Sequence, residues 1–185
     1  LYRRMAMPEE TNRIITDLLS DLCFVSSRKA MRYLAREGFG PERLRFVGDP
    51  MYDIFKLSGA MLQDRAAAQP ADFGLAINEY GICTIHRAEN TDDRDTCLGL
   101  LGALDRAPMP VLLPAHPRLH HRLEAWGWRP AANLRLIDPL GYFDFQSMLR
   151  QSGLVITDSG GVGREAFFAG KPAVVPLESS AWIEA

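Results

Sequence analysis

The 185-residue sequence has few cysteines, no long apolar run and no excess of charge of one sign. Its three cysteines are odd in number and lack CxxC spacing, so we expect buried, reduced thiols and no disulfide framework. No apolar run approaches the ~18 residues that span a bilayer, and no signal-peptide pattern is present. With 21 basic and 23 acidic residues, neither nucleic acid nor an anionic membrane is the expected partner. These absences predict a soluble, cytoplasmic protein.

The composition and the two ends add two expectations. With 47% apolar and 24% charged residues, the chain has the make-up of a globular protein, which excludes collagen, coiled coil and disorder. Position 1 is not methionine, and the last residues show neither a polar tail nor a capping pattern. We therefore expect 185 residues to be a lower bound on the protein's length.

Short apolar segments alternate with helical patterns along the chain. Predicted strands are 22–25, 44–47, 80–85, 111–114, 134–137, 154–157 and 173–175, and predicted helices begin at 9, 29, 51, 94, 119, 143 and 163. This alternation predicts an α/β fold with doubly wound parallel sheets, covered by helices on both faces. An alanine-rich stretch around residues 66–73 has the composition of a linker, so we expect one domain at 1–65 and a second at 66–185.

Polar residues follow three of the predicted strands. They are His86-Arg87-Ala88-Glu89-Asn90, Pro114-Ala115-His116-Pro117 and Asp158-Ser159-Gly160-Gly161. In doubly wound sheets ligands bind beyond the carboxyl ends of the strands, so we expect these clusters to line one rim. A lone histidine is more often structural or merely exposed, and a histidine that leads a polar cluster, as His86 does, has a stronger claim to function.

The third cluster has the features of an anion site. Gly160 and Gly161 allow backbone N–H groups to approach a ligand closely, and the helix that follows presents its positive end. Ser159 adds a hydroxyl donor. Glu165 lies one turn into that helix, where it either accepts hydrogen bonds from a ribose diol or is simply solvated. We expect a diphosphate at this loop.

Other motifs carry weaker signals. The segment from Gly161 to Ala166 matches a dinucleotide fingerprint, but it follows about the fourth strand of its domain instead of the first. Gly170-Lys171-Pro172 lacks the Ser or Thr of a Walker loop and is typical of a helix stop. His116, His120 and His121 have no nearby cysteine or carboxylate to complete a ligand set, so no metal is expected.

Taken together, six segments resemble the UDP-N-acetylglucosamine 2-epimerases of the non-hydrolysing bacterial type. They are Pro8-Glu9-Glu10-x-Asn12-Arg13, Val47-Gly48-Asp49-Pro50-x-x-Asp53, His86-Arg87-x-Glu89-Asn90, His116-Pro117, Asp138-Pro139-Leu140-x-Tyr142, and Thr157-Asp158-Ser159-Gly160-Gly161 through Glu165 to Gly170-Lys171-Pro172. They cover the chain almost end to end, and six in register are far more specific than any one of them.

The resemblance implies a glycosyltransferase-B architecture of two Rossmann-like domains, with the sugar nucleotide in the cleft between them. It implies that the chain begins inside the N-terminal domain and stops before the last helices, so we expect these 185 residues alone to be inactive. In the family, UDP is eliminated to leave a 2-acetamidoglucal and is then added back with C2 inverted. The implied partners are UDP-N-acetylglucosamine and UDP, with no cofactor, and the implied assembly is a homodimer.

The resemblance also implies roles for single residues. Glu9 and His86 match the family's catalytic carboxylate and histidine, and Phe145 matches its contact to uracil. Ser159, Gly160, Gly161 and Glu165 match contacts to diphosphate and ribose. Arg87 and His116 match positions that touch a second, activating UDP-N-acetylglucosamine in some members.

Two segments depart from the family pattern. Gly163-Arg164-Glu165 stands where the family shows Gln-Glu-Glu, and residues 177–184 replace an arginine-containing loop, so that Trp182 takes the place of a sugar-nucleotide contact. Loss of that donor is expected to cost ~1.5–3 kcal/mol in binding. Two alternatives therefore stand beside the epimerase: a retaining glycosyltransferase on the same scaffold and a non-catalytic nucleotide-sugar-binding domain.

Overall fold

A computed structural model describes residues 8–131 and 133–176, except for the side chains of Pro8 and Glu9. The chain divides into two compact units, residues 1–54 and 55–185, and the division falls within helix α3 (Pro50–Met61). The second unit therefore begins earlier than the boundary expected at residue 66. Phe55, the first residue of the second unit, packs within that unit: its ring lies 5.7 Å from Phe168 between centroids and 3.6 Å from the Arg150 guanidinium. Those two partners belong to the second unit.

In the first unit, the described residues before α3 form two α-helices and two short strands. Helix α1 (Pro8–Leu19), strand β1 (Cys23–Val25), helix α2 (Arg28–Arg36) and strand β2 (Leu44–Phe46) follow the predicted order. The 3-10 turn η1 (Pro41–Arg43) leads into β2. The strands pair in parallel, and the buried core of this unit is Cys23, Val25, Phe39 and Leu44. Gly38 ends α2 with a φ of 98°, which confirms the predicted helix stop.

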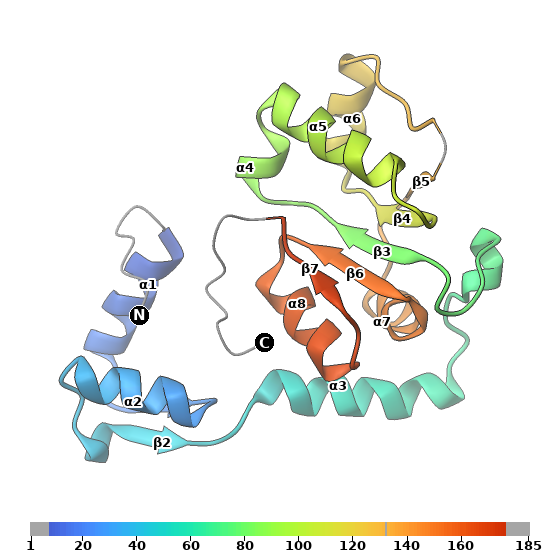
Figure 1. Ribbon diagram of the computed structural model, residues 1–185. Helices are drawn as coiled ribbons and strands as arrows, with labels where there is room; N and C mark the ends of the chain where they lie inside the picture. The colour runs from blue at the N-terminus through green and yellow to red at the C-terminus, as the bar shows by residue number, and fades with distance from the viewer. Residues whose placement is uncertain (1–7, 132, 177–185) are drawn as a thin grey trace. The chain divides into compact units, whose positions relative to one another are not determined.

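The second unit is built on a five-stranded parallel sheet. Its strands are β3 (Gly81–Thr84), β4 (Val111–Pro114), β5 (Leu134–Ile137), β6 (Leu154–Thr157) and β7 (Ala173–Val174), in the order β5-β4-β3-β6-β7. All four neighbouring pairs are parallel. The doubly wound α/β sheet predicted for this part of the chain is confirmed (Figure 1).

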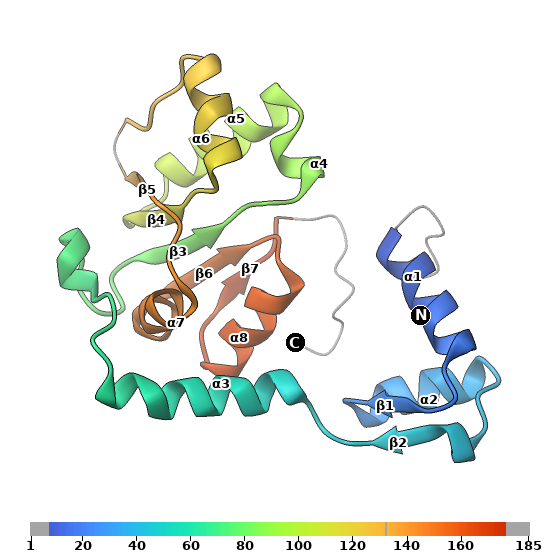
Figure 2. The ribbon, with the colours of Figure 1, turned by 180° about the vertical axis from the view of Figure 1, so that it is seen from behind.

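Helices cover both faces of this sheet (Figures 1 and 2). On one face Val111 and Leu113 of β4 pack with α5 (Arg94–Asp105) and α6 (Pro117–Ala125). On the other face Leu112 packs with α7 (Tyr142–Gln151) and α8 (Gly160–Phe168). Because successive side chains of a strand point to opposite faces, a strand between two helical layers has to be apolar throughout. This explains why the sequences of β3, β4 and β6 are mostly apolar.

The order of the strands creates a topological switch point. From β3 the chain adds β4 and β5 on one side of the sheet, and it then crosses to the other side to add β6 and β7. The connections that leave β3 and β6 therefore run in opposite directions at the carboxyl edge. Open α/β sheets bind ligands in the crevice at such a point. The topology therefore predicts a ligand site at the segments that follow Thr84 and Thr157.

The structure adds elements that the sequence patterns did not predict. The short helix α4 (Ala88–Thr91) follows β3, and 3-10 turns lie at η2 (Leu62–Asp64) and η3 (Pro70–Phe73) within and beside the expected linker. Helix α8 starts at Gly160, three positions before the predicted start. Gly160 and Gly161 therefore form the first turn of a helix, which corrects their assignment to a loop.

The structure also bears on two expectations from the composition, which concern the cysteines and membrane-spanning helices. Cys23, Cys83 and Cys97 are buried and free, as predicted. Across the described residues, every helix is too short or too polar to cross a bilayer.

Candidate functional site

A buried carboxylate lies at the switch point. Asp158 follows β6 directly and its side chain is 0% exposed. It accepts hydrogen bonds from the backbone N–H of His86 (3.0 and 3.1 Å to its two oxygens) and of Arg87 (2.9 Å), and from Nδ2 of Asn90 (3.0 Å). A buried charge is tolerated only when such donors surround it. Asp158 therefore holds the whole turn after β3 in place.

The imidazole of His86 joins this arrangement. Nδ1 lies 2.9 Å from Oδ1 of Asp158, while 59% of the His86 side chain is exposed. One ring nitrogen is thus bound to a fixed carboxylate, and the remainder of the ring faces outward. A histidine held in this way is suited to exchange protons with a ligand.

Arg87 is anchored beside it. Its Nε donates to the backbone carbonyl of Asp158 at 2.9 Å, and its backbone N–H donates to the Asp158 carboxylate. Contacts from both the side chain and the backbone orient the guanidinium at the same edge of the sheet. Arg87 is half-buried, so it is a cation that a ligand can still reach.

The residues after Asp158 form a helix N-terminus. The hydroxyl of Ser159 caps α8 by accepting from the backbone N–H of Val162 at 3.4 Å, and its own N–H donates to Oγ1 of Thr157 at 2.9 Å. Thr157 in turn shares a 2.6 Å hydrogen bond with Thr84 of β3. Because a serine hydroxyl that accepts a bond still has a proton to donate, this end of α8 offers a hydroxyl and backbone donors to an anion.

Glu165 lies on α8, in a less polar setting. Burial raises the pKa of Glu165 above its usual value of 4.5, and Gln146 and Arg150 of α7 oppose this effect. Gln146 is fully buried. Glu165 is therefore desolvated next to polar groups that it can use for orientation. Polar groups of a ligand gain more from such a carboxylate than from a solvated one.

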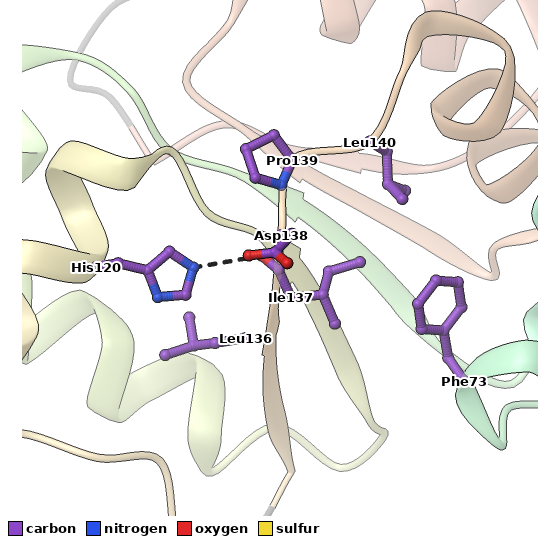
Figure 3. Close-up of a pocket in the computed structure, with 7 residues that line it drawn as sticks. All are labelled: Phe73, His120, Leu136, Ile137, Asp138, Pro139 and Leu140. Atoms are coloured by element: carbon purple, nitrogen blue, oxygen red, sulfur yellow. Dashed lines mark hydrogen bonds between the residues drawn. The ribbon is translucent and has the colours of Figure 1, made fainter.

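Phe145 and the hollow at the end of β5 occupy the α7 side of the unit. Phe145 is partly buried against the apolar cluster that also includes Ile137 and Leu140. A hollow of about 460 Å³ opens at the carboxyl end of β5 and is lined by Phe73, His120 and residues 136–140. Figure 3 shows His120 on one side of the strand end and Phe73 on the other. None of the predicted site residues lines this hollow.

The structure gives His116 a local role. It is the N-cap of α6, and its Nδ1 accepts from the backbone N–H of Arg118 at 3.2 Å. It follows β4, the neighbour of β3, so it shares the carboxyl edge with His86. The polar cluster that contains His116 is thus at the expected edge, with its imidazole engaged as a helix cap.

Cys83 is buried on β3, the strand that leads to His86. Burial raises the pKa of the Cys83 thiol, and the charge of Asp158 adds to the effect. Since the thiolate is the nucleophilic form of cysteine, Cys83 is not a candidate nucleophile.

Two expectations fall on parts that are not described. Glu9 lies in the first turn of α1, but its side chain is outside the described residues. Trp182 and the segment 177–184 are outside them as well. The other predicted residues fall into three groups. His86 and Arg87 contact Asp158, and Ser159, Gly160 and Gly161 follow it directly. Phe145 and Glu165 lie on α7 and α8, and His116 stands apart as the N-cap of α6.

The central residue of the site is one that the sequence pattern left without a role. Asp158 stands in a strand-end cluster and in one of the six family segments, but neither pattern gives it a role of its own. A signal was nevertheless present, because an aspartate directly after the apolar run 154–156 needs partners if it is buried. The identity of those partners depends on which strand lies next to β6.

The chain matches a known protein family along almost its whole length. A family model described as UDP-N-acetylglucosamine 2-epimerase matches residues 3–185. The UDP-2,3-diacetamido-2,3-dideoxy-D-glucuronate 2-epimerase of Pseudomonas aeruginosa is 41% identical over 186 residues, covering 97% of this chain and 50% of that protein. A UDP-N-acetylglucosamine 2-epimerase of Methanococcus maripaludis is 30% identical over 183 residues, with 94% and 50% covered.

Solved structures agree with these matches. The UDP-GlcNAc 2-epimerase of Methanocaldococcus jannaschii, in complex with UDP-GlcNAc and UDP, superposes with a TM-score of 0.78 at 27% identity. The superposition covers 93% of this chain and 49% of that one. The chain thus spans about half the length of the curated relatives it matches.

Proposed function

Because this chain belongs to the UDP-N-acetylglucosamine 2-epimerase family, we propose that it is part of an enzyme that inverts C2 of a UDP-linked 2-acetamido sugar. The observation that carries the proposal is the cluster at the switch point. There a buried Asp158 orients His86 and Arg87 beside the Ser159-capped N-terminus of α8. This arrangement offers a proton-transfer group, a cation and anion donors within one edge of a sheet.

The proposed substrate is UDP-N-acetylglucosamine, converted to UDP-N-acetylmannosamine. A base removes the C2 proton, the C1–O bond to the diphosphate breaks, and UDP leaves a 2-acetamidoglucal with a double bond between C1 and C2. In the second step the UDP oxygen adds back to C1, and a proton is delivered to the opposite face of C2. No net oxidation occurs, so the sequence of steps needs acid–base groups and anion donors but no redox partner.

The residues of the second unit supply most of these parts in the proposal. His86 exchanges a proton with the sugar, while Ser159 and the backbone N–H groups at Gly160 and Gly161 receive the departing diphosphate. Arg87 adds positive charge next to them. Glu165 binds the ribose hydroxyls. Glu9 is proposed as the second acid–base group, on the strength of the family motif in which it stands.

We place the uracil on the α7 side, against Phe145. The hollow at the end of β5 adjoins this region, since Leu140 lines it and packs in the same apolar cluster as Phe145. Its walls include the flat ring of Phe73, and His120 supplies a polar group at one side. A pocket with apolar walls and few polar groups suits a planar base.

A second substrate has specific support. The Pseudomonas aeruginosa relative, at 41% identity, is named for a 2,3-diacetamido uronate. The same C2 chemistry applies to both sugars, because both carry an acetamido group at C2 and UDP at C1. The two substrates differ at C3 and at C6, where the uronate carries a carboxylate.

The test is exchange at C2 in deuterated water. The full-length protein, and not the 185-residue chain alone, is purified and incubated separately with UDP-N-acetylglucosamine and with the diacetamido uronate, and the C2 proton signal is followed by NMR. Deuterium incorporation with the first supports the proposal as stated. Deuterium incorporation only with the diacetamido uronate would mean that the proposed reaction is correct and the proposed substrate is wrong. If neither sugar exchanges at C2 while UDP still binds, the non-catalytic alternative is correct. Transfer of sugar to an acceptor without a free glucal would identify a glycosyltransferase.

A further inference from the structure

We infer that Asp158 is a positioning residue for His86: it holds the proton of the neutral imidazole on Nδ1 and presents Nε2 to the substrate. The inference rests on the proposed function for its catalytic meaning. The contact itself is independent of that function, since Nδ1 of His86 lies 2.9 Å from Oδ1 of Asp158.

The bonds that fill the carboxylate determine where the proton lies. A carboxylate offers about four lone-pair positions. At Asp158 these are taken by N–H donors from the backbone of His86, the backbone of Arg87 and the Asn90 amide, with the His86 imidazole as the fourth. The two backbone N–H groups and the Asn90 amide N–H are donors only, so none of them can accept a proton from Asp158. Asp158 therefore remains an acceptor, and the shared proton belongs to Nδ1 of His86.

Burial makes this arrangement rigid. Asp158 is 0% exposed, and its backbone is held as well, because its N–H donates to the carbonyl of Thr84 at 3.3 Å and its carbonyl accepts from Nε of Arg87. The His86 side chain is 59% exposed. The ring is thus fixed through one nitrogen at the buried end, which leaves the outer part for the ligand. In a neutral imidazole with the proton on Nδ1, Nε2 carries the lone pair that accepts a proton.

The same chain contains the opposite case, which serves as an internal control. Nδ1 of His116 accepts a hydrogen bond from the backbone N–H of Arg118. A neutral His116 therefore carries its proton on Nε2. Two histidines at the same sheet edge are predicted to be in opposite tautomers, for reasons that lie entirely in their local hydrogen bonds.

The first test needs no substitution at Asp158. The protein is labelled with ¹⁵N-histidine, and the imidazole nitrogens are observed by NMR while the pH is raised until their chemical shifts no longer change. His86→Asn and His116→Asn variants assign the signals. We expect His86 with the proton on Nδ1 and His116 with the proton on Nε2. A His86 signal with the proton on Nε2 overturns the inference.

The second test measures the catalytic consequence. In Asp158→Asn we expect kcat to fall by ~10²–10⁴, because the amide no longer enforces the tautomer. We expect KM to change by less than about tenfold, since UDP contacts other groups. Asp92→Asn is the matched control, because Asp92 is an exposed carboxylate paired with Arg118 and Arg122, and kcat should not change.

Each outcome decides a separate point. A folded Asp158→Asn protein with unchanged kcat overturns the inference. If that variant does not fold, the tautomer measured in the unsubstituted protein decides. If His86 shows the Nδ1–H tautomer but neither sugar nucleotide exchanges at C2, the contact is supported and the proposed function is overturned.

Discussion

At the scale of single residues, His86 and Asp158 form one hydrogen-bonded pair in which the imidazole is exposed and the carboxylate is buried. In the proposed site the imidazole contacts the sugar and the carboxylate does not. Exposure and burial are both needed, because a mobile histidine loses its orientation and a solvated aspartate binds water instead of the ring. The pair is formed by residues that are far apart in the chain.

Substitution of His86 should separate chemistry from binding. In His86→Asn we expect turnover to fall by ~10²–10⁴, the usual contribution of one acid–base group. UDP affinity should stay within about tenfold, since the imidazole serves the sugar. Calorimetry with UDP and C2 exchange by NMR measure the two effects. His121→Asn on α6, where 82% of the side chain is exposed, is the control. Near-normal turnover in His86→Asn would make this residue structural.

Glu165 should show opposite effects on stability and on binding. Burial raises the pKa of Glu165 above 4.5, so the folded protein prefers the protonated carboxyl. Ionisation therefore costs folding free energy, and this cost is absent below the ordinary pKa and develops as the pH rises through the raised one. We expect Glu165→Gln to raise Tm at about pH 7 and to lose this advantage below about pH 4.

The same substitution should weaken UDP by ~1–3 kcal/mol, because the ribose hydroxyls lose a charged acceptor. Glu124→Gln on α6, where 77% of the carboxylate side chain is exposed, should change neither quantity. Thermal unfolding across pH and UDP calorimetry check both parts. A lower Tm for Glu165→Gln at neutral pH would show that Gln146 and Arg150 more than compensate the buried charge.

At the scale of elements, helix α8 combines a structural cap with a binding surface. Its first residues, Gly160 and Gly161, lie directly after the Ser159 cap, so the N–H groups proposed for the diphosphate are those that every helix start leaves free. The helix ends at Phe168, and Gly170, whose φ is 65°, turns the chain away from the helix before β7. Residues next to each end of α8 therefore determine where the helix begins and where it ends.

Removal of the cap should affect stability and binding together. We expect Ser159→Ala to lower the free energy of unfolding by about 1 kcal/mol and to weaken UDP binding, because one hydroxyl serves both purposes. Ser27→Ala is the matched control, because Ser27 caps α2 by accepting from the N–H of Ala30 at 3.0 Å. Ser27→Ala should lower the free energy of unfolding and leave UDP affinity unchanged. Equal UDP affinity in both variants would remove Ser159 from the binding site.

At the scale of the whole molecule, the two units differ in the size of their sheets and of their buried apolar cores. The first has two strands of three residues each and a buried core of four side chains. The second has five strands and two large buried clusters, one on each face of its sheet. Small cores bury too little apolar surface to hold a fold firmly.

Hydrogen exchange should report this difference directly. We expect amides of β1 and β2 to exchange faster than those of β3, β4 and β6, because local opening of the first unit exposes less apolar surface. Mass spectrometry of peptides from the exchanging 185-residue chain provides the measurement. Equal protection in the two units would show that the first is stabilised by contacts other than its own core.

Assembly as a homodimer stays a prediction.

Local patterns were sufficient for most of the fold. The strands and helices of the described residues follow the predicted order, because apolar periodicity, helix caps and glycine stops act within a few residues of one another. Helix α4 and the true start of α8 were missed. Both depend on contacts with Asp158 or on a serine cap next to two glycines, where neighbouring signals compete.

What the sequence by itself determined is the set of elements and the polar residues at their ends. Only the tertiary structure decided that β3 and β6 are neighbours, which brings Asp158 within hydrogen-bonding distance of His86, 72 positions earlier in the chain. Strand order depends on how helices pack across both faces of the sheet, and this information is not contained in any short segment. For the same reason the start of the second unit at Phe55 became visible only in its packing against Arg150 and Phe168.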